Sequence, residues 1–211
     1  MGRGSSKAGG GGDLLGKEGD TGTVTDVKDM IAQRGTKGAE IDEVLAVSKR
    51  LNALYAEGEI NQFQTAKMTG TALAYYDSQG NIAVNQRYMN GAKMDAAYDA
   101  AVAKNFHPSR GNKSGMQAVA SHEYGHALSD KAASKMGLGS LEEASRQIVE
   151  RARAKTGHKT NMSFAGKISG YAQYNFAETV AEAVSDWFCN GSKASKESRA
   201  VMSVVNSILR R

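Results

Sequence analysis

The sequence predicts an α+β domain that is mostly helical, with a small β-sheet or hairpin beside a central helix. Two patterns favour this class: apolar residues recur at helical spacing in most segments after residue 40, and one pair of β-type runs flanks a short turn. Residues 1–22 are instead rich in glycine and poor in apolar residues, which is typical of a linker. We therefore expect a flexible N-terminal arm over residues 1–37 and one domain over residues 38–211.

The first predicted elements follow this arm. Residues 40–56 are predicted to form an amphipathic helix; for residues 59–68 the pattern is ambiguous, and a short helical continuation is one interpretation. Its apolar face consists of Ile41, Val44, Leu45, Leu51, Leu54 and Tyr55. Next, residues 71–76 and 81–88 have strand-like compositions and flank a turn at 77–80, so we expect a β-hairpin.

Further helices are predicted over 92–104, 114–135, 141–156, 175–189 and 195–211. The first of them ends before Pro108, because the residue before a proline disfavours helix. Ser114 is a typical N-cap for the next helix, and Gly137 and Gly139 are typical of its end. The helix over 175–189 is apolar nearly all round, so we expect it to be buried.

Composition limits the classes of function. The net charge of +5 is mild and the basic residues are scattered, so we expect no nucleic-acid partner. No apolar run approaches the roughly 20 residues of a membrane span, and the N-terminus lacks the apolar region of a signal peptide. We expect a cytoplasmic protein without a membrane partner. The single Cys189 is expected to be a buried apolar residue.

The most informative segment is His122-Glu123-Tyr124-Gly125-His126. Residues i and i+4 lie on one face of a helix, so His122 and His126 can bind one Zn²⁺ together. Glu123 lies beside them without being a ligand, where it can accept a proton from the attacking water. Gly125 weakens the helix, which indicates that another element packs closely against it. The motif predicts a catalytic zinc site.

A catalytic zinc site needs a third protein ligand and an open position for water. The metzincin pattern requires Gly and His at positions where this chain has Ser129 and Ala132, so that family is excluded. His107 and His158 are the other histidines. His107 is expected to be a hydrogen-bonded or solvated bystander in a loop, and His158 is expected at the surface.

Carboxylates are the remaining candidates for the third ligand. Glu178, Glu182 and Asp186 are spaced i, i+4, i+8 and form one stripe of the helix over 175–189. Carboxylates on a buried helix repel one another and are costly to desolvate. A cation, or hydrogen bonds to metal-bound histidines, would offset that cost. A solvated acidic face is the alternative, but this helix lacks lysine and arginine.

The HEYGHAL segment, followed some fifty residues later by ETVAEA, resembles the gluzincin zinc metallopeptidases. The nearest type is the catalytic domain of anthrax lethal factor and related zincin domains encoded by phages and prophages. The resemblance covers about half the chain and implies a zincin-like fold, with His122, His126 and Glu178 as zinc ligands. It further implies that Glu182 supports a ligand and that Tyr171 donates a hydrogen bond to the oxyanion.

A second register remains open. In thermolysin-like enzymes the ligand Glu is followed four residues later by an Asp that orients a zinc histidine. Glu182 and Asp186 also match that pattern, with Glu182 as the ligand and Asp186 as its supporting carboxylate. The position of Tyr171, seven residues before Glu178, favours Glu178.

The resemblance implies a zinc-dependent metalloendopeptidase acting on a protein or peptide in extended form, with Glu123 as general base. Residues 82–86 are the candidate edge strand for pairing with substrate, an ordinary edge strand being the alternative. The segment after residue 183 also resembles the ends of phage minor head proteins. The alternative function is therefore a virion-associated structural protein with phage particle proteins as partners. A third option is a purely structural zinc site. Such a site usually has four protein ligands, often cysteines, and no open position, and the single cysteine of this chain is poorly placed for it.

Overall fold

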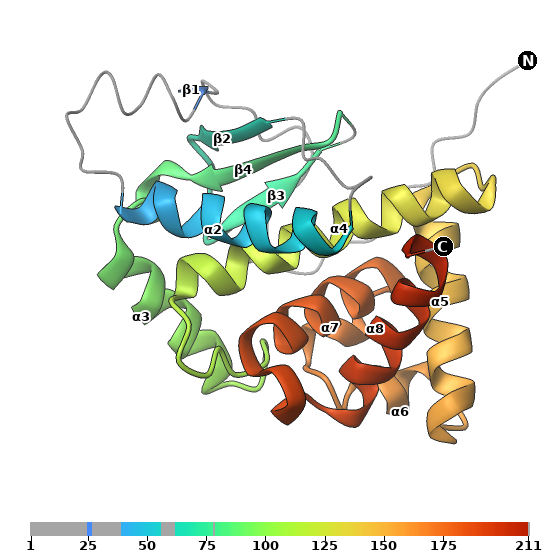
Figure 1. Ribbon diagram of the computed structural model, residues 1–211. Coiled ribbons are helices and arrows are strands. Elements are labelled where there is room, and N and C mark those ends of the chain that lie inside the picture. Colours follow the sequence, from blue (N-terminus) through green and yellow to red (C-terminus); the bar gives the residue numbers. More distant parts are fainter. Residues whose placement is uncertain (1–24, 27–38, 56–61, 78, 211) are drawn as a thin grey trace, which may run out of the picture.

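The computed structural model describes residues 25–26, 39–55, 62–77 and 79–210. It has the predicted α+β class, with a small sheet on one side of a larger set of helices (Figure 1). Most of the predicted N-terminal arm, and its boundary at residue 37, lie outside the described residues. No helix in the described ranges has the length and apolar character needed to span a membrane.

The sheet has four strands in the order β1-β2-β4-β3. These strands are β1 (Thr25–Asp26), β2 (Gln62–Ala66), β3 (Ala74–Tyr76) and β4 (Asn81–Asn85). The central pair, β2 and β4, is parallel, whereas β1 pairs antiparallel with β2 and β3 pairs antiparallel with β4. The β4 strand therefore lies inside the sheet, and β3 forms the end of the strand order.

Two features of this sheet differ from the sequence prediction. Residues 59–68 were ambiguous, with a short helical continuation as one interpretation, but Gln62–Ala66 form the strand β2, so that interpretation was wrong. The β2 strand pairs on both sides, and such long-range pairing overrides a weak local preference. The β1 strand comes from residues that were predicted to belong to the flexible arm.

The predicted hairpin is confirmed as β3 and β4, with shorter strands than expected. Asp77 organises its turn: one carboxylate oxygen accepts hydrogen bonds from the backbone N–H groups of Gln79 and Asn81, both at 2.9 Å. Gly80 has a φ of 84°, a conformation that residues with a side chain rarely adopt.

The predicted helices are confirmed to within two residues at each end. The helical elements are α2 (Ala39–Leu54), η1 (Gln86–Tyr88), α3 (Gly91–Val102), α4 (Gly115–Met136), α5 (Leu141–Thr156), α6 (Asn161–Ala165), η2 (Tyr171–Gln173), α7 (Phe176–Asn190), η3 (Gly191–Lys193) and α8 (Lys196–Leu209). The N-cap of α4 is Ser114, which forms a capping box with Gln117, and its C-cap is Gly137 in the left-handed conformation.

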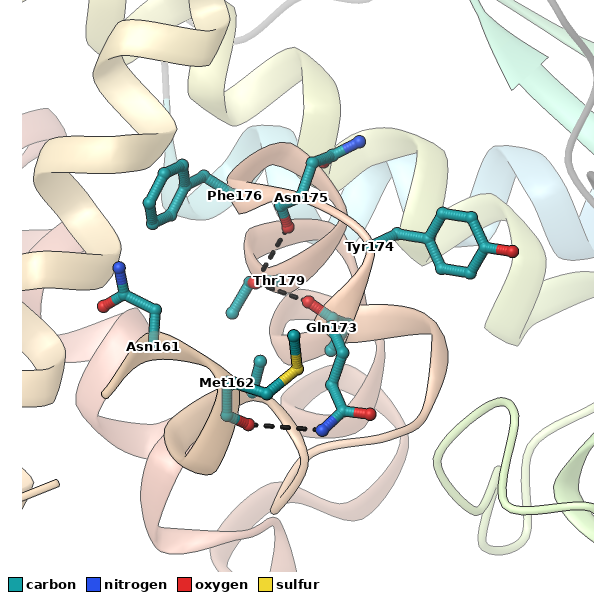
Figure 2. A pocket seen from close by; sticks show the side chains of 9 residues that line it. Asn161, Met162, Gln173, Tyr174, Asn175, Phe176 and Thr179 are labelled. Atoms are coloured by element: carbon teal, nitrogen blue, oxygen red, sulfur yellow. Dashed lines mark hydrogen bonds between the residues drawn. The ribbon is translucent and has the colours of Figure 1, made fainter. Parts of the chain in front are cut away.

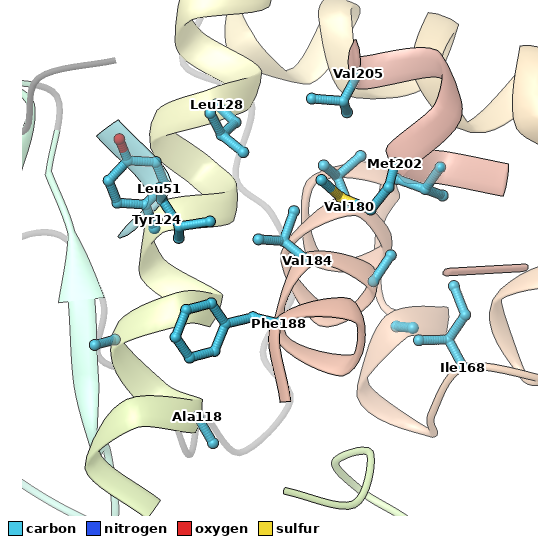
Figure 3. Packing of buried hydrophobic residues seen from close by; sticks show 14 of the residues in the cluster. Leu51, Ala118, Tyr124, Leu128, Ile168, Val180, Val184, Phe188, Met202 and Val205 are labelled. Carbon is cyan, nitrogen blue, oxygen red and sulfur yellow. The ribbon is translucent and has the colours of Figure 1, made fainter. Parts of the chain in front are cut away.

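Helix α4 is the centre of the fold. It contacts β3 and β4 on one side and α5, α7 and α8 on the other (Figure 1). Figure 3 shows part of the core around these helices, where Leu128 of α4 points toward the side on which Val184 of α7 lies. As predicted, α7 is buried over most of its surface. The two helices that carry the predicted metal ligands are therefore packed directly against each other.

Candidate metal centre

Helices α4 and α7 bring His122, His126 and Glu178 together. The Oε2 atom of Glu178 lies 3.1 Å from Nε2 of His122 and 3.6 Å from Nε2 of His126. The three candidate ligand atoms all lie within 4.8 Å of one another. Tetrahedral zinc with bonds of about 2.0–2.1 Å separates its ligand atoms by roughly 3.3–3.4 Å. The two distances from Oε2 of Glu178 are close to that value.

Local structure at the start of α7 fixes the position of Glu178. Asn175 is the N-cap, and its side-chain oxygen accepts a hydrogen bond from the backbone N–H of Glu178 at 2.8 Å. A carboxylate in the first turn is also favoured by the helix dipole. The Asn175 cap therefore fixes where α7 begins, and this start places the Glu178 carboxylate beside the two histidines of α4.

Gly125 allows α4 and α7 to approach closely. A Cβ atom at this position would lie 2.6 Å from the Cα of Ala181 and 3.2 Å from the Cβ of Val184. This confirms the prediction that another element packs against the glycine within the motif.

Three buried polar atoms at this site have no hydrogen-bond partner among the described residues. They are Nε2 of His122, Oε2 of Glu178 and Oε1 of Glu123. The first two are close, but their relative orientation is not that of a hydrogen bond. Buried polar atoms are normally paired, so this cluster calls for a bound species. Two imidazole nitrogens and one carboxylate oxygen are donors that Zn²⁺ prefers, so the residues fit that ion.

The protonation of the neighbouring groups is set by burial. Burial lowers the pKa of His126 to about 4, so this imidazole is neutral near pH 7 and its lone pair is available to a metal. Burial also raises the pKa of Glu123 to about 8; His122 opposes this rise, and Glu178 and Glu182 add to it. These values refer to the protein without a metal. A carboxyl group with a pKa near the working pH suits a general base.

Glu182 is fully buried and holds His122 from behind. Its Oε1 atom lies 2.7 Å from Nδ1 of His122, and its Oε2 atom accepts a hydrogen bond of 2.7 Å from the Ser169 hydroxyl. Burial alone would raise the pKa of Glu182, but His107 and His122 outweigh it and hold the pKa at about 2. An ionised carboxylate only accepts hydrogen bonds, so Nδ1 of His122 carries a proton, and Nε2 is the ring nitrogen that faces Glu178 and the cluster.

In the described part of the chain, Asp186 does not support a ligand histidine, which corrects that prediction. Its carboxylate accepts hydrogen bonds from the side chain of Asn190 and the backbone N–H of Ser195, both at 2.9 Å. Eight residues along a helix correspond to roughly 12 Å, which takes Asp186 away from Glu178. Asp186 instead fixes the connection between α7 and α8. The geometry therefore favours the register with Glu178 in the cluster and Glu182 behind His122.

Tyr171 lies at the candidate site, as predicted. It is buried, and its ring stacks on His122 with centroids 5.9 Å apart and an interplanar angle of 30°. Its predicted role toward an oxyanion remains a proposal.

Residues 172–176 also line a pocket of about 200 Å³, together with Met162 and Thr179 (Figure 2). Polar groups of this lining bond to one another: the side chain of Gln173 donates to the Met162 carbonyl, and the Thr179 hydroxyl donates to the carbonyl of Ala172. The side chain of Tyr174 points away from Met162 and is 51% exposed.

The expected substrate strand requires a correction. Residues Ile82–Asn85 belong to β4, which pairs on both sides and is not an edge strand. The strand at the end of the sheet order beside α4 is β3. From β3, Tyr76 stacks on the ring of His126 at a centroid distance of 6.4 Å, and its hydroxyl donates to Asp130 at 3.2 Å. The sheet edge beside the histidines is therefore formed by β3.

Sequence reasoning underestimated the other two histidines. His107 was expected to be a bystander, yet it is 3% exposed and its Nδ1 lies 2.9 Å from Oε1 of Glu182. No spacing rule connects a loop histidine to a helix 75 residues later, so the sequence carried no signal for this contact. His158 was expected at the surface, but it is partly buried and pairs with Glu197 at 2.7 Å.

Comparisons of the chain with protein-family models, with curated proteins and with solved structures find no match. The geometry of the residues above is therefore the basis for a functional assignment.

Proposed function

We propose that this chain is a zinc-dependent metalloendopeptidase with a zincin-like, gluzincin-type site. The observation that carries the proposal is the buried cluster of His122, His126 and Glu178. Two of its three ligand atoms lack hydrogen-bond partners among the described residues, and Glu123 lies next to them. Glu182 supports the proposal because it holds His122 in the tautomer that a metal requires.

The proposed residues have separate roles. His122, His126 and Glu178 hold the zinc ion, which when bound polarises the scissile carbonyl and lowers the pKa of a water molecule. Glu123 accepts a proton from the attacking water and later gives it to the leaving amine. Tyr171 donates a hydrogen bond to the oxygen that becomes negatively charged.

An extended peptide is the substrate class that this arrangement favours. The β3 strand has β4 on one side, and its other side is the end of the described strand order. A peptide that pairs with this edge adds a strand beside α4, close to His126. We propose this edge in place of residues 82–86.

The test compares zinc content and cleavage of an unfolded protein mixture for the wild type and Glu123→Gln, with Glu150→Gln on α5 as a matched control. We expect about one zinc per chain in all three proteins and a loss of cleavage of about 10²–10⁴-fold in Glu123→Gln alone. Absence of zinc from the wild type would contradict the metal site. Zinc without cleavage in the wild type would favour the particle-associated structural role.

A further inference from the structure

The loop between α3 and α4 is clamped to the segment that carries Tyr171. The backbone N–H groups of Gly170 and Tyr171 donate to the carbonyls of Asn105 and Phe106 at 2.8 and 2.9 Å. A Cβ atom at Gly170 would lie 2.9 Å from the Asn105 carbonyl oxygen, so a glycine permits this approach. The loop that presents His107 therefore has a fixed position relative to the candidate site.

The ring of His107 is enclosed by aromatic residues. It is nearly parallel to the ring of Tyr98, at an angle of 8° and a centroid distance of 5.2 Å. Phe106 and Tyr171 contact it edge-on at 5.1 and 5.6 Å. These contacts restrict rotation of the imidazole, so the direction of its Nδ1 atom is set before any ligand binds.

His107 and His122 share one oxygen of Glu182. The Oε1 atom of Glu182 lies 2.9 Å from Nδ1 of His107 and 2.7 Å from Nδ1 of His122. A carboxylate oxygen has two lone pairs and can accept both hydrogen bonds. With Ser169 on the other oxygen, the buried carboxylate is held from three directions.

The remaining ring nitrogen of His107, Nε2, is buried without a hydrogen-bond partner among the described residues. Burying a polar atom without a hydrogen-bond partner costs free energy. An apolar ring of similar size would fill the same space without that cost. The contact made by Nδ1 is therefore the feature of this side chain that packing alone does not explain.

We propose that His107 is a positioning residue for the metal centre, because it holds Glu182 in the orientation in which Glu182 fixes the tautomer of His122. This inference rests on the proposed zinc site. His107 lies behind Glu182 and acts through it.

The test measures the zinc dissociation constant by competition with a chromophoric chelator, and uses circular dichroism to check that each variant is folded. His107→Phe keeps a ring against Tyr98 and removes the donor. His107→Asn places an amide N–H near the position of Nδ1. We expect His107→Phe to bind zinc about tenfold more weakly, which is at the low end for an outer partner of a ligand, and His107→Asn to recover at least part of that loss.

A double-mutant cycle decides whether His107 acts through Glu182. We expect Glu182→Gln to weaken zinc binding about 10–100-fold, and addition of His107→Phe to Glu182→Gln to cause little further loss. If His107→Phe does not fold, His107→Leu replaces it. A folded donor-free variant that binds zinc as tightly as the wild type, full additivity in the cycle, or His107→Asn as weak as His107→Phe would overturn the inference.

The same measurements separate this inference from the proposed function. A wild-type protein that binds zinc but cleaves no peptide bond would contradict the peptidase proposal while leaving the cycle fully interpretable. A wild-type protein that binds no zinc would remove both the proposed site and the role of His107.

Discussion

Gly125 of α4 lies so close to Ala181 of α7 that an added Cβ atom would be 2.6 Å from the Cα of Ala181. The neighbouring atom is backbone, which cannot rotate away as the end of a flexible side chain can. The separation of the two helices, and with it the distance from His122 to Glu178, therefore depends on the absence of one carbon atom.

Gly125→Ala should destabilise the protein. Alanine is favoured over glycine within a helix by about 1 kcal/mol, but overpacking against Ala181 typically costs about 1–3 kcal/mol and here meets backbone. We expect a net loss in the free energy of unfolding measured with urea, and weaker zinc binding. Gly139→Ala is the control, because no atom lies within 4 Å of an added Cβ there. Equal stability of the two variants would contradict the prediction.

Glu182→Gln and Asp186→Asn make the same chemical change on one helix but should differ in their effect on metal binding. We expect Glu182→Gln to weaken zinc binding about 10–100-fold, because it removes the ionised partner of His122. Asp186→Asn should leave zinc affinity unchanged and lower the free energy of unfolding by about 1–3 kcal/mol, since it disturbs the hydrogen bonds to Asn190 and Ser195. A larger effect of Asp186→Asn on zinc would restore the alternative register.

Tyr171→Phe should lower kcat by about 10²–10³-fold with little change in zinc content, because it removes a proposed oxyanion donor and leaves the ligands in place. Tyr174→Phe is a matched control three residues away, where the ring is 51% exposed. Steady-state kinetics on one cleaved peptide would measure both. Similar rates for the two variants would exclude this role for Tyr171.

The thiol of Cys189 should be unreactive in the folded protein. Burial raises its pKa to about 12, and only the thiolate reacts readily. At pH 8 we expect alkylation on the order of 10³-fold slower than in urea-unfolded protein, measured by mass spectrometry. As pH rises, the thiol of the unfolded state loses its proton before the buried thiol of the folded state does. The free energy of unfolding that comes from burying the neutral thiol is therefore lost between about pH 9 and 12. Rapid labelling at pH 8 without unfolding would contradict the burial.

Much of the helical framework could be predicted because its signals are local. Ser114 and Gly137 mark the ends of α4 through capping and the left-handed conformation, and both residue types are typical of these positions in the sequence itself. The histidine pair and the carboxylate stripe were also visible, since helical spacing places such residues on one face.

The features that could not be predicted from the sequence depend on contacts between residues far apart in the chain. The β2 strand is stabilised by neighbours on both sides, and the inward position of β4 follows from a parallel pairing that no local pattern specifies. His107 reaches Glu182 only because its loop is bonded to the segment at Gly170. Asp186 likewise accepts a hydrogen bond from Ser195 at the start of α8, a contact that helical spacing does not indicate.

The division of the cluster between α4 and α7 also has a consequence during synthesis. His126 and Glu178 are 52 residues apart in the sequence. At about 5–20 residues per second, roughly 3–10 s pass between addition of the second imidazole and addition of the carboxylate. A nascent chain therefore carries the histidine pair and Glu123 for seconds without Glu178, and the cluster of His122, His126 and Glu178 can assemble only after α7 has been made.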